Sequence, residues 1–324
     1  MKKLAFIGQE YFHAMFEDDL NDLFEVKVFP FNFEMNLNDF KGLIEFQADF
    51  NVFFRGEFIS NELLDLLNGI KINLSSEPFP RKINNKWHYT KDSLVRYFVF
   101  RKIRGKKFDY VFHYDKASLL LFEKDKLGIS GEFLLPAATK AYAPENVPKK
   151  WDLFFFGRSS IHREKFFAYS KHKYNFLHIA HGIWGKDVVN YVSRAKINLN
   201  VHAEEEISWE PRVQAMLAMG AFVISEKINP NDYLRPGKDY VEVETPEDLN
   251  EKIEYYLKNE EEREKIAENG RKRALEYFSA DRNFKDLIKK IENHELKNFK
   301  TEPRGSFLFD ILNIFWLLKI KCKK

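Results

Sequence analysis

The chain has 324 residues, which as a prior suggests two domains of ordinary size. Hydrophobic residues make up 44 % and charged residues 31 %, a balance that allows a sizeable core and excludes global disorder. The 52 basic and 49 acidic side chains leave a net charge of +3, which is too balanced to indicate a nucleic-acid partner.

The first half alternates near-continuous apolar runs with helical patterns, which predicts an α/β fold with a doubly wound parallel sheet. The N-terminal apolar run is too short for a signal peptide and forms the first strand instead. The predicted strands are 4–8, 25–31, 50–58, 71–76, 110–115 and 133–136. The predicted helices lie near 10–24, 37–47, 60–68 and 90–103, with a short one after residue 115.

Polar groups follow three of these strands: Gly8 to Glu10, then Arg55 and Glu57, then Ser75 to Glu77. The carboxyl ends of parallel strands meet at one edge of a sheet, so these groups are expected to face one site. Each group taken alone is more typical of a helix cap or a surface ion pair, and it is their shared position that favours a site.

Residues 137–150 hold two prolines and no periodicity, and they read as a linker. A second sheet is predicted from strands 151–157, 174–182, 196–202, 221–225 and 240–243. After it, Thr245 is the expected N-cap of a helix with Pro246 at the first position and Asp248 in place of a capping-box glutamate. The charged run 260–278 predicts a solvated surface helix.

The stretch 196–226 reads as a strand, a polar loop, a helix and a second strand, which together form a βαβ unit. The helix shows an apolar pattern at Val213, Met216 and Leu217, with Pro211 in its first turn. The loop carries His202, Glu204, Glu205, Glu206, Glu210 and Arg212. A loop that only had to turn would not need so many charges, so a ligand site is expected here.

The segment LNVH, an acidic loop, Glu-x-Arg and MGAFVISE resembles the donor half of two-domain GT-B glycosyltransferases. It is most similar to the group-1, spore-maturation-protein-like (CgeB-type) branch, and the resemblance covers roughly 150–290. It implies two Rossmann-like domains facing a central cleft, with an acceptor domain at 1–140, a donor domain at 151–290 and a tail at 300–324. Ala215 stands where that family carries a glutamate, so Glu210 or Gln214 would have to take over its role.

The resemblance implies transfer of a hexose from a nucleotide sugar, UDP- or GDP-linked, to a glycan or lipid-linked hydroxyl in bacterial cell-surface polysaccharide synthesis. A diphosphate leaving group needs fixed cations and helix N-termini. The candidate catalytic residues are Arg158, Arg212, Glu210 and His202, and the candidate donor-binding residues are Gly157, Ser159, Ser160, Gln214, Ser225 and Glu226. An ordinary capped βα turn, and a surface arginine paired with Glu210, are the plain alternatives for these patterns.

No metal or further cofactor is expected, because the sequence has no D-x-D pair and no HExxH motif. Whether the reaction retains or inverts the sugar is open, and an inverting base would be Glu57, Glu77 or His13. Of the histidines, His178, His181 and His13 are weaker candidates for a site role than His202. A sugar-nucleotide epimerase and a non-catalytic glycan- or nucleotide-binding protein remain the alternatives. The single cysteine, Cys322, fits a reducing cytoplasm.

The C-terminal run FLFDILNIFWLLKI, 307–320, predicts a helix of about 21 Å, too short for the ~30 Å core of a bilayer. Ser306, Asp310, Asn313 and Lys321 form a narrow polar stripe on an otherwise apolar surface. The helix either packs onto the first domain or lies in a membrane interface, on the inner face of the membrane. Trp316 and the terminal lysines favour the interface.

Overall fold

The structure is a computed structural model, and it describes residues 1–13, 20–137, 139–205, 210–229, 231–302 and 305–321. It divides into two compact units. The first comprises Met1–His13, Leu20–Leu135 and the chain from Phe284 onward, and the second comprises Pro136–Asn283. The C-terminal segment therefore returns to the first unit.

The main sheet of the first unit is wholly parallel and runs in the order β2-β1-β3-β4-β7-β9. Its strands are β1 (Lys2–Gly8), β2 (Phe24–Pro30), β3 (Phe50–Phe54), β4 (Ile70–Ser75), β7 (Tyr110–His113) and β9 (Gly131–Glu132). All five residues of β3 are buried, as expected for a central strand that is covered on both faces. The prediction of a doubly wound parallel sheet is confirmed.

Helices of the first unit connect these strands. They are α1 (Glu10–His13), η1 (Leu37–Phe40), α2 (Lys41–Phe46), η2 (Gly56–Phe58), α3 (Asn61–Leu66), α4 (Lys91–Phe100), η3 (Arg101–Ile103), η4 (Lys116–Ser118), α5 (Leu119–Lys124), most of α11 (Ala280–Glu292) and α12 (Phe307–Lys321). The predicted helix near 10–24 is seen only in α1, because residues 14–19 lie outside the described residues and β2 begins at Phe24.

Three local predictions in the first unit are wrong. The strand expected at 50–58 ends at Phe54, because Arg55 takes a left-handed backbone (φ 61°) and starts a helical turn. The last strand of the main sheet is β9, which lies just before the strand expected at 133–136. A hairpin of β5 (Arg81–Ile83) and β6 (Lys86–His88) was missed; its turn residues Asn84 and Asn85 both have positive φ. A second short pair joins β8 (Leu127–Gly128) to β15 (Lys300–Thr301).

The second unit holds a five-stranded parallel sheet in the order β11-β10-β12-β13-β14. Its strands are β10 (Trp151–Phe156), β11 (Phe176–Ile179), β12 (Ala195–Asn200), β13 (Val223–Glu226) and β14 (Val241–Val243). All five strands of this sheet were predicted from the sequence. The middle strand, β12, is buried from Ile197 to Asn200 and ends at the polar loop.

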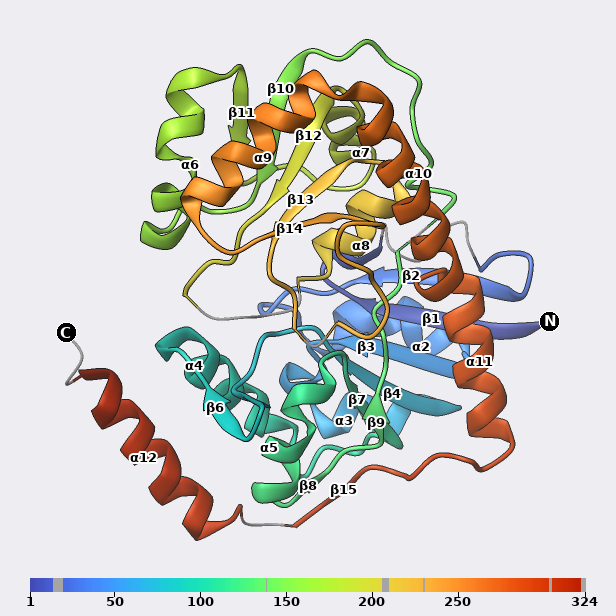
Figure 1. Ribbon diagram of the computed structural model, residues 1–324. Helices are drawn as coiled ribbons and strands as arrows, with labels where there is room; N and C mark the ends of the chain where they lie inside the picture. The colour runs from blue at the N-terminus through green and yellow to red at the C-terminus, as the bar shows by residue number, and fades with distance from the viewer. Residues whose placement is uncertain (14–19, 138, 206–209, 230, 303–304, 322–324) are drawn as a thin grey trace. The chain divides into compact units, whose positions relative to one another are not determined.

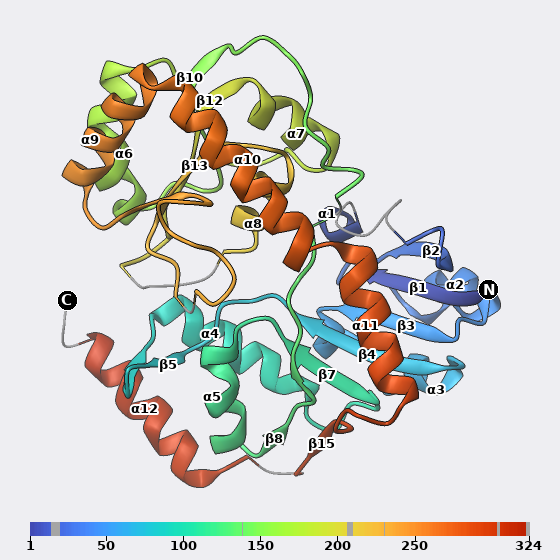
Figure 2. The same ribbon diagram turned by 45° about the vertical axis from the view of Figure 1, so that its right-hand side comes forward.

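The helices of the second unit are α6 (Ile161–Lys173), α7 (Lys186–Ser193), α8 (Arg212–Ala218), α9 (Pro246–Lys258), α10 (Glu260–Tyr277) and the start of α11. Thr245 caps α9 as predicted, whereas the Asp248 carboxylate accepts from Glu244 rather than from the cap. The helix α10 is less solvated than predicted: Arg263, Ile266 and Ala274 are buried on its inner side. Figure 2 shows α8 and α10 close together, and they pack against each other.

Two residues of the polar stripe predicted for the C-terminal helix, Asp310 and Asn313, face the protein. The side chain of Asn313 in α12 is 1 % exposed, and Asp310 pairs with Arg101 at 2.9 Å. Trp316 is buried and stacks on Tyr89 with 4.7 Å between ring centroids, so it is not placed at a water boundary. The helix therefore packs on the first unit through this side. No helix in the described part of the chain is both long and apolar enough to cross a bilayer.

Candidate functional site

The loop after β10 begins at Gly157, where the backbone has φ +138°. A Cβ atom at this position would lie 2.7 Å from Nη1 of Arg212, so a side chain would displace that guanidinium. The Gly157 N–H donates to the carbonyl of Ile179 at 2.9 Å, and His178 Nε2 donates to the Gly157 carbonyl at 2.8 Å. Glycine thus allows the loop and Arg212 to meet, and His178 has a structural contact here.

Ser160 is the N-cap of α6, since its hydroxyl accepts from the N–H of Arg163 at 3.2 Å. Ser159 donates its hydroxyl to the Glu164 carboxylate, and the Arg158 side chain is exposed. The first N–H groups of a helix have no intrahelical acceptor, and the helix dipole favours an anion there. The loop 157–160 therefore presents a helix N-terminus together with an exposed cation.

Arg163 fixes this loop to the end of β12. Its side chain is 2 % exposed, with Nε donating to the carbonyl of Val201 and Nη1 to the carbonyl of Arg158, both at 2.8 Å. Its guanidinium also lies over the Phe155 ring, at 4.9 Å from the centroid. Burial lowers the pKa of Arg163 to about 10, against the opposing effect of Glu210. Sequence reasoning missed this residue, although an arginine three residues before a buried Phe pair was a visible signal.

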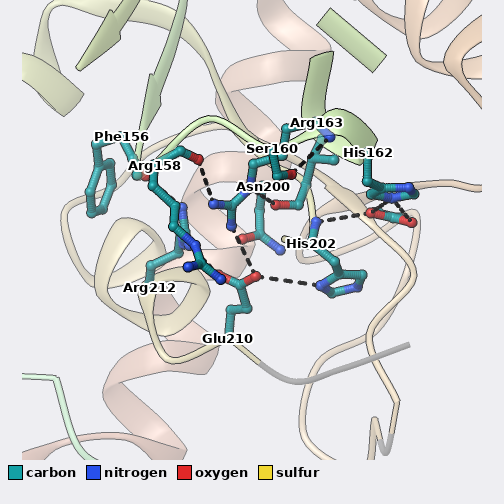
Figure 3. A network of polar contacts seen from close by, with 12 residues as sticks. Phe156, Arg158, Ser160, His162, Arg163, Asn200, His202, Glu210 and Arg212 are labelled. Atoms are coloured by element: carbon teal, nitrogen blue, oxygen red, sulfur yellow. Dashed lines mark hydrogen bonds and ion pairs between the residues drawn. The ribbon is translucent and has the colours of Figure 1, made fainter. Parts of the chain in front are cut away.

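Glu210 lies at the centre of the cluster, and Figure 3 shows arginine side chains gathered around it. It pairs with Nη2 of Arg212, with Nη2 of Arg163 at 3.3 Å and with Nδ1 of His202 at 3.7 Å. Burial opposes ionisation, but these cations outweigh it and hold the pKa of Glu210 well below its usual range. Arg212 also donates to the carbonyl of Phe156. The pair of Glu210 and Arg212 is thus only partly exposed rather than a surface contact.

His202 is buried at the end of β12. Its Nε2 donates to the carbonyl of Lys227 at 2.8 Å, and its backbone N–H donates to Glu226 at 2.9 Å. Burial alone would lower the pKa of His202. The hydrogen bond to Glu210 and the charges of Glu226 and Glu210 have the larger combined effect, so the pKa of His202 is raised. The imidazole is therefore protonated more readily than a free histidine, and its ring lies between fixed partners.

Glu226, at the end of β13, also accepts from His162 Nε2 at 2.9 Å. Ser225, beside it in the strand, is buried and accepts from the amide of Asn200 at 2.9 Å. Neither His162 nor Asn200 was singled out from the sequence. The amide oxygen of Asn200 is buried without a partner among the described residues. The ends of β12 and β13 thus share one polar network with the start of α6.

Other candidates lie further from this network. Gln214 and Ala215 are both buried in α8. Glu205 pairs with Lys165 at the surface, and Glu206 lies outside the described residues. The side chains of the described residues include no group of three or more metal-binding residues close enough to hold an ion.

Polar groups at two strand ends of the first unit meet, as predicted. Arg55 donates to Glu57 at 2.7 Å and to Glu77 at 2.8 Å, and Arg96 also pairs with Glu77. Burial raises the pKa of Glu57 despite the nearby charge of Arg55. Two of the three candidate bases, Glu57 and Glu77, are therefore paired with arginine. The side chain of the third, His13, lies outside the described part.

Comparison with solved structures establishes the fold class. A sucrose-phosphate synthase from Thermosynechococcus elongatus is similar over 91 % of this chain and all of that chain, with a TM-score of 0.59 and 11 % identity. Anabaena HepE, in complex with UDP and glucose, is similar over 90 % of this chain and all of that one, with a TM-score of 0.56 and 9 % identity. The chain has the two-domain fold of the GT-B glycosyltransferases.

A third similar structure is that of T4 phage BGT in complex with its UDP-glucose substrate, with a TM-score of 0.52 and 12 % identity, covering 89 % of this chain and 98 % of that one. In sequence, residues 145–289 match a family model described as glycosyl transferase-like. This range contains the whole network around Glu210. No match was found among curated protein sequences.

Proposed function

We propose that the protein transfers a sugar, a hexose, from a nucleoside-diphosphate donor to a hydroxyl of a glycan or lipid-linked acceptor. The observation that carries this proposal is the convergence of Arg158, Arg212 and the N-terminus of α6 at the carboxyl edge of a parallel sheet. Negative charge grows on the diphosphate as the glycosidic bond breaks, and fixed cations and helix dipoles stabilise it there.

Each group has a role in this proposal. Arg158 and the amides of the first α6 turn bind the diphosphate, while Gly157 lets Arg212 approach it. Glu210 and Arg163 position these two arginines, because Arg163 holds the Arg158 backbone and Glu210 holds the Arg212 side chain. Ser225, Glu226 and Gln214 lie on the β13 and α8 side, where ribose or base would bind.

The donor is a UDP- or GDP-sugar. Transfer needs no metal ion, since the arginines supply the positive charge that a metal ion would bring to the diphosphate. HepE and BGT have been solved with UDP-glucose, which supports a uridine donor for this chain. We place the protein in the CgeB-type branch and in bacterial cell-surface polysaccharide synthesis at the inner face of the membrane, in the cytoplasm. The motif LNVH supports the branch, and the glycosyl transferase-like match supports a glycosyltransferase.

The test is release of UDP or GDP from a panel of nucleotide sugars, with and without glycan and lipid-linked acceptors. A transferase releases the nucleotide from one donor, and an acceptor accelerates that release. Conversion of the sugar without nucleotide release would identify an epimerase instead. A donor that raises the melting temperature but is never turned over, with any acceptor, would identify a binding protein.

A further inference from the structure

The helix α12 is apolar on both of its sides, and only one side is covered. The inner side carries Phe309, Asn313 and Trp316, all of them buried against the first unit. Tyr97 contacts Phe309 edge-on at 5.7 Å, and Trp87 lies 5.2 Å from Trp316. These contacts fix which way the helix faces, so its other side is turned outward.

The outward side repeats at i, i+3, i+4 and i+7, the spacing of one helix face. Its members are all large and apolar: Phe307, Leu308, Ile311, Ile314, Phe315 and Leu318. Their exposed fractions run from 48 % for Ile311 to 76 % for Phe307 and Leu308. A contiguous exposed apolar face of this kind marks an interaction surface, because burying it is favourable.

The charges around this face are basic. The sole carboxylate in the sequence of α12 is Asp310, and it is paired with Arg101 on the inner side. Lys319 is exposed near the end of the helix, and the sequence adds Lys321, Lys323 and Lys324. Such an arrangement is complementary to an anionic surface.

The neighbouring helix α4 extends the surface, and Figures 1 and 2 both show α4 beside α12. Val95 and Phe98 of α4 are exposed apolar residues one turn apart. Phe98 lies 5.8 Å from the guanidinium of Arg101, which joins α4 to Asp310 of α12. Lys91 and Lys102, near the two ends of α4, are exposed.

We propose that the outward face of α12 docks the protein on an anionic lipid surface, with the helix lying in the plane of the interface. At 15 residues the helix is about 22 Å long, too short to cross the ~30 Å hydrocarbon core, so it lies on the membrane rather than spanning it. The apolar face enters the boundary between headgroups and acyl chains, and the exposed Lys319 contacts the phosphates.

A second copy of the chain fits this face less well. In a two-fold dimer the same patch meets itself, so no acidic partner is supplied for the exposed Lys319. Like charges in such a contact repel each other, whereas an anionic membrane attracts them.

The test is sedimentation of the full chain with vesicles of phosphatidylcholine, with or without phosphatidylglycerol. We expect binding to vesicles with phosphatidylglycerol, weakened when salt rises from about 0.1 to about 0.5 M because exposed charges are screened. Ile311→Glu with Leu318→Glu should weaken binding by roughly tenfold or more, since two charges would enter an apolar boundary. Leu66→Glu, at a site in α3 that is 47 % exposed, is the matched control and should bind like the wild type.

Unchanged melting temperatures show that the variants fold, since all three altered side chains point to solvent. Binding by the double variant equal to that of the wild type would overturn the proposal, as would a wild type that ignores anionic vesicles. A wild-type dimer in light scattering, lost in the double variant and without vesicle binding, would assign the face to a second copy. Vesicle binding is measured without a sugar donor. A failure of the docking proposal can therefore be distinguished from a failure of the proposed transferase activity.

Discussion

Two arginines of the second unit have different surroundings. Substituting them should therefore distinguish an effect on donor binding from an effect on the stability of the fold. Arg158 is exposed, whereas Arg212 is 17 % exposed and engaged by Glu210 and the Phe156 carbonyl. Removing Arg158 takes away an exposed cation of the proposed donor site. Removing Arg212 also leaves Glu210 with fewer partners, so the fold loses stability as well.

We therefore expect Arg158→Ala to reduce kcat/KM by a factor that corresponds to roughly 2–4 kcal/mol in transition-state stabilisation. Its melting temperature should stay near that of the wild type. Arg212→Ala should show a similar kinetic loss together with a lower melting temperature. Steady-state kinetics and thermal unfolding of both variants check this, and near-normal activity of both would refute the diphosphate assignment.

The pH dependence of stability should report His202. Its pKa in the folded chain is raised above the ordinary value of 6.5, so its stabilising contribution is complete below pH 6.5. The contribution is lost as pH rises through the folded pKa. We expect the difference in melting temperature between the wild type and His202→Asn to be largest below pH 6.5 and to shrink above it. A difference that does not change with pH would show that folding does not raise the pKa of His202.

The sequence located much of this site but not its internal pairing. Glycine, arginine and serine after an apolar strand were enough to predict the loop, because strand ends in parallel sheets converge. The pairing of Glu210 with Arg163 and His202 depends on which side chains the sheet brings together across 47 and 8 residues of chain. No local pattern encodes such distances, so Arg163, His162 and Asn200 were missed.

At the scale of elements, the turn at Gly157 links a strand, a helix and a distant arginine. Gly157→Ala would be strained at φ +138°, and its Cβ would move Arg212 out of contact with Phe156. We expect a lower melting temperature and weaker donor binding, each by an amount on the order of 1–3 kcal/mol. Calorimetric titration with the donor and thermal unfolding measure the two effects.

The matched control is Gly237→Ala, at φ +75° with nothing within 4 Å of the added atom. It should lose stability through backbone strain while binding the donor normally. Equal losses of donor binding in both variants would show that strain, and not the displacement of Arg212, explains the effect of Gly157→Ala.

Elements were predicted correctly where a pattern extended over several residues. They were predicted wrongly where the conformation of one residue decided where the element ended. The strands of the second unit were found because each carries apolar residues in a continuous or an alternating run. The strand at 50–58 was drawn too long because the sequence FFRGEF does not show that Arg55 adopts a left-handed backbone. For α12 the helix was correct, but the facing of its polar stripe depended on Arg101, which is 209 residues away from Asp310 in sequence.

At the scale of the whole molecule, we propose that the arginine cluster stabilises the charge of the diphosphate, as a divalent cation does in other transferases. Donor binding and sugar transfer should therefore persist in excess EDTA. Adding magnesium or manganese should change the rate little, because the diphosphate charge is already matched by Arg158, Arg212 and the α6 N-terminus. An absolute requirement for either metal in a transfer assay would contradict this.

The most direct measurement is the affinity for a nucleoside diphosphate and for the matching monophosphate, such as UDP and UMP, with the wild type and Arg158→Ala. We expect the wild type to bind the diphosphate roughly tenfold or more tightly, since a hydrogen bond to a charged group contributes about 1.5–3 kcal/mol. Arg158→Ala should lose most of this preference and leave the monophosphate affinity almost unchanged. Equal wild-type affinities for UDP and UMP and for GDP and GMP, or equal losses for both ligands in the variant, would contradict a diphosphate site at the start of α6.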